Sequence, residues 1–82
     1  MYWAGPTVDD TYYEGYLVGQ GTGSDNVLIN VGAKTLHRNF GEPIKVQSAA
    51  WDELLTLCDR FDSGAVTDRD AEQVYDLCLA VM

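Results

Sequence analysis

Residues 48–82, SAAWDELLTLCDRFDSGAVTDRDAEQVYDLCLAVM, carry the clearest periodic pattern in the chain. Apolar side chains recur there every three or four positions, which is the spacing of one face of an α-helix. In the first half they are Trp51, Leu54, Leu55, Cys58 and Phe61, and in the second half Ala71, Val74, Tyr75, Cys78, Val81 and Met82. We expect two amphipathic helices that form a hairpin.

Capping residues mark the ends of both helices. Ser48 is a favourable N-cap for the first helix, and Thr67 is one for the second. Gly64 follows shortly after Asp62, where a glycine can adopt the left-handed conformation that closes a helix. The first helix is therefore expected to end near Asp62, and a tight turn at Ser63 and Gly64 should follow it.

The first 47 residues predict strands, because Tyr-, Val- and Ile-rich runs alternate with clusters of Gly, Pro, Asn and Asp. The expected strands span residues 11–20, 26–31, 34–40 and, at an edge, 44–46, after an N-terminal arm at residues 1–10. In the first strand neither alternating face is fully apolar, so the pattern leaves open which face meets the core. Gly15 in this strand indicates a bulge or a close approach of another segment.

Strands followed by helices are typical of the α+β class. We expect one domain of 82 residues, in which a three- or four-stranded antiparallel β-meander (residues 11–46) precedes a helical hairpin (residues 48–82) packed on one face. A domain of this size buries roughly 60–65% of the surface that its unfolded chain exposes. That leaves room for one small core and little room for a deep catalytic cleft.

The chain is strongly acidic, with a net charge of −8. Residues 48–82 hold eight acids and two arginines, a net charge of −6, whereas residues 1–47 carry −2. Such a surface repels nucleic acid and anionic membranes and attracts basic proteins. No segment approaches the ~20 apolar residues of a membrane-spanning helix, and the first residues lack the features of a signal peptide. We therefore expect a cytoplasmic protein.

Residues that could carry chemistry lack the partners that such chemistry needs. The glycines of residues 19–23 are not followed by the helix start and the Gly-Lys-Ser/Thr ending of a phosphate loop. His37 has no zinc ligands or triad partners nearby and is expected to face solvent. Cys58 and Cys78 are expected as small core residues, although facing positions on a helical hairpin also allow a disulfide. We expect no enzymatic activity, cofactor or metal.

Residues 59–70, DRFDSGAVTDRD, partly match an EF-hand calcium loop, with Asp, Ser, Gly and Asp at positions one, five, six and twelve. Phe61 removes the ligand at position three, and Asp70 is shorter than the bidentate Glu that the motif needs. A capped helical hairpin explains the same residues without metal. A weakly calcium-responsive module is kept as an alternative.

The remaining feature with functional content is a set of acids along one edge of the second helix. Asp68, Glu72 and Asp76 follow one another at intervals of four residues and rise by about 6 Å per step. A protein groove that binds phosphates through Lys and Arg could accept such an edge instead, and a merely solvated face is the alternative interpretation. The first helix and the turn add Asp52, Glu53, Asp59 and Asp62.

In these properties the chain resembles the small acidic inhibitors encoded by phages and mobile elements, above all anti-CRISPR proteins. The resemblance rests on a short single domain, an α+β prediction, strong acidity, acid-lined helices and the lack of a catalytic motif. It implies a Cas protein or a CRISPR surveillance complex as partner, in the cytoplasm of a bacterial host. The acidic helices would face a basic channel, without direct contact to nucleic acid or membrane.

Two questions stay open. Tyrosines are common interface anchors, so Tyr12, Tyr13 and Tyr16 are candidate partner-binding residues, but each is equally compatible with the core of the sheet. A different class of function is a structural or assembly module. Such a module would self-associate, for example as a homodimer, through its sheet edge and aromatic arm.

Overall fold

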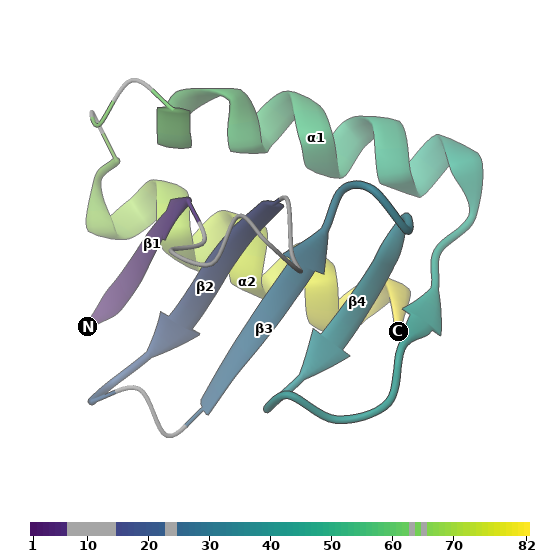
Figure 1. Cartoon of the computed structure of the whole chain (residues 1–82). Coiled ribbons are helices and arrows are strands. Elements are labelled where there is room, and N and C mark those ends of the chain that lie inside the picture. Colours follow the sequence, from purple (N-terminus) through teal and green to yellow (C-terminus); the bar gives the residue numbers. More distant parts are fainter. Residues whose placement is uncertain (7–14, 23–24, 63, 65) are drawn as a thin grey trace.

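A computed structural model of the chain describes residues 1–6, 15–22, 25–62, 64 and 66–82. The protein has two layers, an antiparallel β-sheet and a pair of helices that cover one of its faces (Figure 1). In chain order the elements are β1 (Tyr2–Pro6), β2 (Gly15–Gln20), β3 (Asp25–Asn30), β4 (Thr35–Arg38), β5 (Ile44–Lys45), α1 (Ser48–Asp62) and α2 (Asp68–Val81). The predicted α+β class and the order of sheet and helices are confirmed.

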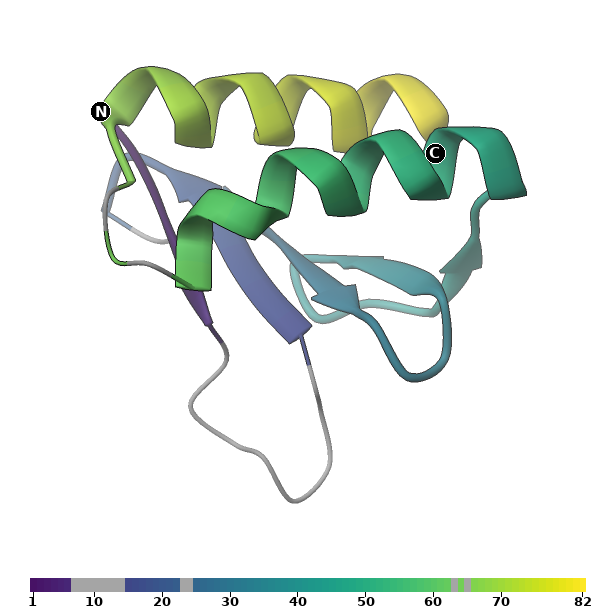
Figure 2. The same cartoon turned by 90° about the horizontal axis from the view of Figure 1, so that it is seen from above.

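The sheet is a meander in which each strand pairs antiparallel with the next, in the order β1-β2-β3-β4-β5. Its number of strands exceeds the three or four expected because the N-terminal arm is itself partly a strand. Residues 2–6 form the edge strand β1, which pairs with β2 from Tyr2 opposite Gln20 to Pro6 opposite Tyr16. Seen from above, the two helices lie side by side over the sheet (Figure 2).

The predicted strand bounds change where the backbone leaves the extended conformation. Lys34, Asn39 and Phe40 have positive φ angles of 56°, 53° and 60°, which are incompatible with a β-strand. The strand expected at residues 34–40 is therefore confined to β4. Shifts of one residue occur elsewhere, because β3 starts at Asp25 and stops before Val31, and β5 stops before Val46. Residues 11–14 of the first expected strand lie outside the described residues.

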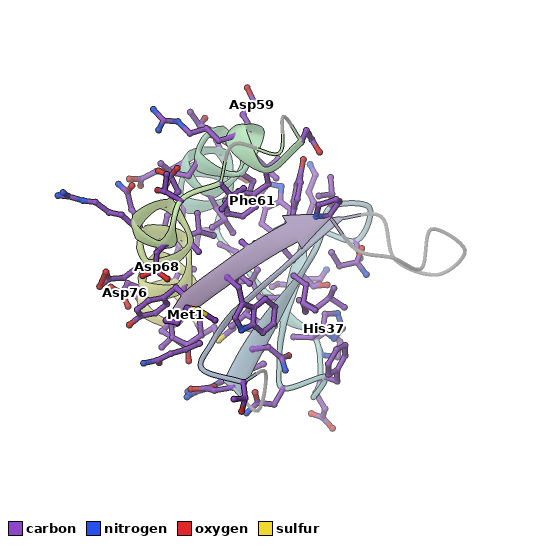
Figure 3. The ribbon with its side chains drawn as sticks, turned by 90° about the vertical axis from the view of Figure 1, so that its left-hand side faces the viewer. Met1, His37, Asp59, Phe61, Asp68 and Asp76 are labelled. Carbon is purple, nitrogen blue, oxygen red and sulfur yellow. The ribbon has the colours of Figure 1, made fainter. Side chains whose placement is uncertain are left out.

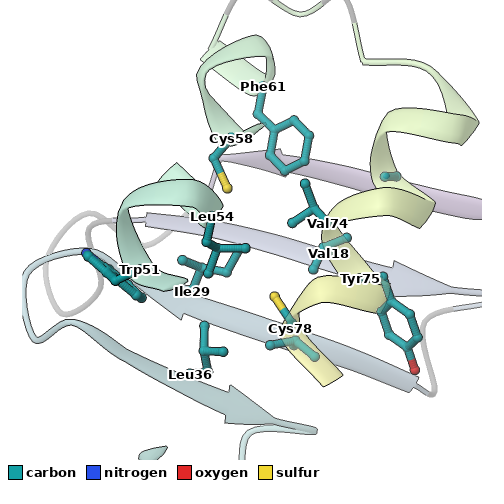
Figure 4. Close-up of a cluster of buried hydrophobic side chains, with 12 residues drawn as sticks. Val18, Ile29, Leu36, Trp51, Leu54, Cys58, Phe61, Val74, Tyr75 and Cys78 are labelled. Carbon is teal, nitrogen blue, oxygen red and sulfur yellow. The ribbon is translucent and has the colours of Figure 1, made fainter. Parts of the chain in front are cut away.

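The core lies between the sheet and the helices, as Figure 4 shows. The strands contribute Val18, Val27, Ile29 and Leu36, and the helices contribute Trp51, Leu54, Cys58, Phe61, Ala71, Val74, Tyr75 and Cys78. Each of these helical residues belongs to the predicted apolar faces, so the helical periodicity is confirmed. The helix-facing side of β2 is the one that carries Val18.

The other face of the sheet explains why the sequence pattern of β2 was ambiguous. Leu17 lies opposite Leu28 on that face, and Leu28 is only 3% exposed although no helix covers it. A Cβ at Gly19 would overlap the indole ring of Trp3, which therefore lies over Gly19. Apolar side chains thus occupy both faces of β2, and neither face reads as solvent-exposed.

Gly15 lies where two strands approach closely. A Cβ at this position would overlap the carbonyl oxygen of Ile29 in β3. The predicted close approach at Gly15 is confirmed, and it explains why this position of β2 has no side chain.

The helix ends follow the predicted caps with one exception. Thr67 has extended backbone angles, and its hydroxyl accepts a hydrogen bond from the Asp70 N–H (3.2 Å) while the Asp70 carboxylate accepts one from the Thr67 N–H (3.3 Å). This reciprocal pair is a capping box. Gly64 has a φ of 75°, which confirms the left-handed residue after α1.

The exception is the start of α1. The Trp51 N–H donates to the Gln47 carbonyl at 2.9 Å, which is the first backbone bond of this helix. Ser48 is consequently the first helical residue rather than the cap, and the cap position falls on Gln47. Among the described residues, no helix has both the length and the apolar character needed to cross a membrane.

Candidate partner-binding surface

Three carboxylates line the edge of α2 that borders β1. We call Asp68, Glu72 and Asp76 the acid row; Asp68 and Asp76 are exposed, and Glu72 is half-buried. Figure 3 shows Asp68 and Asp76 next to Met1 on one side of the molecule, with Asp59 apart from them on α1. The predicted grouping of these three acids on one helix edge agrees with this placement.

Tyr2 of β1 lies within the acid row. Its backbone N–H donates to Asp68 Oδ1 at 2.7 Å, and its ring contacts the ring of Tyr75 with centroids 5.7 Å apart. Burial raises the pKa of the Tyr2 phenol, and the negative charges of Asp76, Glu72 and Asp68 raise it further. A tyrosine is protonated at neutral pH even at its ordinary pKa of 10.0, so the surface combines three carboxylates with one hydroxyl donor.

Sequence reasoning left open whether Tyr2 docks on the core or forms part of a contact surface, and it did not place Tyr2 beside the acid row. The available signal was its bulky apolar character in an arm that contains two aromatic residues. The position opposite α2 depends on the pairing of β1 with β2, which the short segment YWAGP does not predict.

The described ion pairs leave the acid row to solvent. Arg60 pairs with Asp70 at 3.4 Å, and Arg38 lies 3.8 Å from Asp25. Neither pair includes a member of the acid row. Arg69 and Gln73 line a shallow hollow together with Glu72 and Asp76, so one cation flanks the row.

The acids predicted on α1 are exposed but do not form a continuation of the acid row. Asp52 and Glu53 lie on the exposed side of α1. Asp59 lines a groove between the helices together with Arg60 and Asp70. These carboxylates add to the negative field of the helical layer, while the row itself is confined to α2.

Asp62 and Tyr16 are brought together at the end of α1. The Tyr16 hydroxyl donates to Asp62 Oδ2 at 2.7 Å, and the Tyr16 ring meets the edge of the Phe61 ring with centroids 5.7 Å apart. Burial, the hydrogen bond and the charge of Asp62 raise the pKa of Tyr16 to about 12. Tyr16 packs against the core, whereas Tyr12 and Tyr13 lie outside the described residues.

The residues that could carry other chemistry are held in structural roles. Cys58 and Cys78 are buried free thiols, and burial is the main cause that raises the pKa of each to about 12. His37 lies on the sheet face away from the helices (Figure 3), where its ring nitrogens lie 3.2 Å from Thr35 Oγ1 and 3.1 Å from the Gly41 carbonyl oxygen. Neither thiol is poised as a nucleophile, because the thiolate is the reactive form.

The residues that partly match a calcium loop have other structural roles. Asp59 belongs to α1, Phe61 is 2% exposed in the core, and Asp70 serves the capping box of α2 and the ion pair with Arg60. Within the described parts of the chain, no group of three or more His, Cys, Asp or Glu side chains is arranged to hold a metal ion.

Comparisons of the chain with protein families, with curated proteins and with solved structures find no match.

Proposed function

We propose that the protein is a non-enzymatic inhibitor of the phage anti-CRISPR type. It occupies a basic nucleic-acid-binding surface of a Cas protein or a CRISPR surveillance complex. The observation that carries this proposal is the acid row, whose three carboxylates share one helix edge and take no part in the described Arg–Asp pairs.

The spacing and the charge of the acid row suit a phosphate-binding groove. Successive carboxylates rise by about 6 Å along α2, within a factor of two of the roughly 3.4 Å rise per phosphate along one DNA strand. Attraction between the carboxylates and the lysines and arginines of such a groove is screened by dissolved salt. Binding should therefore weaken as the salt concentration rises.

The test measures the displacement of a fluorescent target DNA from a panel of purified Cas effectors and surveillance complexes, at salt concentrations from about 50 to about 200 mM. The row variant carries Asp68→Asn, Glu72→Gln and Asp76→Asn together. The control variant carries Asp52→Asn, Glu53→Gln and Asp59→Asn, so both lose the same charge. Asn at position 68 keeps an oxygen that can accept from the Tyr2 N–H.

We expect the wild-type protein to displace DNA from at least one complex. The row variant should lose at least about tenfold in apparent affinity, about 1.4 kcal/mol, and its salt dependence should become shallower. The control variant should lose much less, because it keeps the row. Equal losses in the two variants, or no displacement by the wild-type protein, would contradict the proposal.

A second candidate function is an assembly module that pairs through its sheet edges. Both edges of the sheet, however, are poorly suited to pairing with another strand. At β1 the outward N–H of Tyr2 is taken by Asp68, and Pro6 has no N–H to offer. In an antiparallel ladder alternate N–H groups point away from the partner strand, so positions 2, 4 and 6 of β1 point outward. This leaves the N–H of Ala4 as the outward donor of β1. The opposite edge, β5, has only two residues. Blocked and short edges are how proteins avoid strand pairing between copies.

Light scattering distinguishes the two candidates without any partner. The inhibitor should remain monomeric at about 100 µM, a concentration at which weak assembly contacts already form oligomers. A stable dimer or larger species would favour the assembly module.

A further inference from the structure

We draw no further inference here: the strongest candidate, the hollow at the N-terminus of α1 that is lined by Lys45, Gln47, Ala50, Ala80 and Val81, consists of a helix N-terminus beside one exposed lysine, and no other feature of the described residues points to a ligand there.

Discussion

At the scale of single residues, two tyrosines tie the sheet to the helices through carboxylates in different surroundings. The Tyr75 hydroxyl donates to Asp25 Oδ2 at 2.5 Å in a partly buried site, and the Tyr16 hydroxyl donates to the exposed Asp62. Removing a donor from a less exposed carboxylate costs more, because water replaces it less well.

We therefore predict that Tyr75→Phe lowers the free energy of unfolding by about 1–3 kcal/mol. Tyr16→Phe should cost about 0.5–1 kcal/mol, because water can solvate Asp62 once the hydroxyl is gone. Urea unfolding of both variants measures the difference. A loss at Tyr16 as large as that at Tyr75 would show that exposure of the carboxylate does not decide the cost.

At the scale of elements, the pairing of β2 with β3 depends on the lack of a side chain at Gly15. A Cβ there would overlap the Ile29 carbonyl oxygen, which is part of the backbone and cannot move aside cheaply. We predict that Gly15→Ala lowers the free energy of unfolding by at least about 2 kcal/mol. Gly5→Ala is the matched control in β1, since nothing lies within 4 Å of its Cβ. It should be neutral or stabilising by up to about 1 kcal/mol, and equal losses at the two positions would contradict the close approach.

The acid row should weaken α2 itself. Like charges four residues apart on a helix cost about 0.2–0.5 kcal/mol per pair, and the row contains two such pairs. We predict that the double change Glu72→Gln and Asp76→Asn raises the free energy of unfolding by about 0.5 kcal/mol. The gain should vanish in about 1 M salt, where the Debye length is roughly 3 Å. A loss of stability at low salt would mean that the carboxylates stabilise the fold.

The helices could be predicted because each has two agreeing signals, a helical apolar period and a capping residue. Thr67 and Gly64 mark ends that the structure places at the same positions. The strand β1 could not be predicted, because its five residues include Gly and Pro, which are rare in strands. The end of β4 was missed because Phe40 fits an alternating apolar pattern, while its positive φ is set by the hydrogen bonds of Asn39.

The candidate site was predictable only in part, for a related reason. Acids at intervals of four residues lie on one edge of a helix, so the grouping of the acid row follows from helix geometry alone. The neighbours of the row depend on which strand lies beside α2. The position of the Tyr2 phenol beside the acid row is therefore known only from the tertiary structure. The same limit applies to Tyr16, because the alternating pattern of β2 does not show which face of the strand packs against the helices.

At the scale of the whole molecule, stability should fall at alkaline pH. Cys58, Cys78, Tyr16 and Tyr75 each have a pKa raised to about 12, from ordinary values of 9.0 for Cys and 10.0 for Tyr. The folded state therefore holds its protons at pH values where the unfolded state has lost them. The stabilisation is complete below the unfolded pKa and is lost as the pH rises through the folded pKa.

We predict a free energy of unfolding that is insensitive to these four groups up to about pH 9 and then falls toward pH 12. In the double variant Cys58→Ala and Cys78→Ala, the fall should begin about one pH unit later, because only the phenols remain. Urea unfolding at each pH measures the curve. An onset that does not move in the double variant would exclude the thiols as its source.

The contact between Asp68 and the Tyr2 N–H places two separate demands on one position. The hydrogen bond to Tyr2 requires only an acceptor oxygen at position 68, whereas the proposed inhibition requires a negative charge there. A library of all twenty amino acids at this position, sorted once for folded protein and once for inhibition, should therefore give different survivors. Asparagine should persist in the first sort and be depleted in the second. Alanine should be depleted only modestly in the first sort, because water can solvate the exposed Tyr2 N–H, and it should also be depleted in the second.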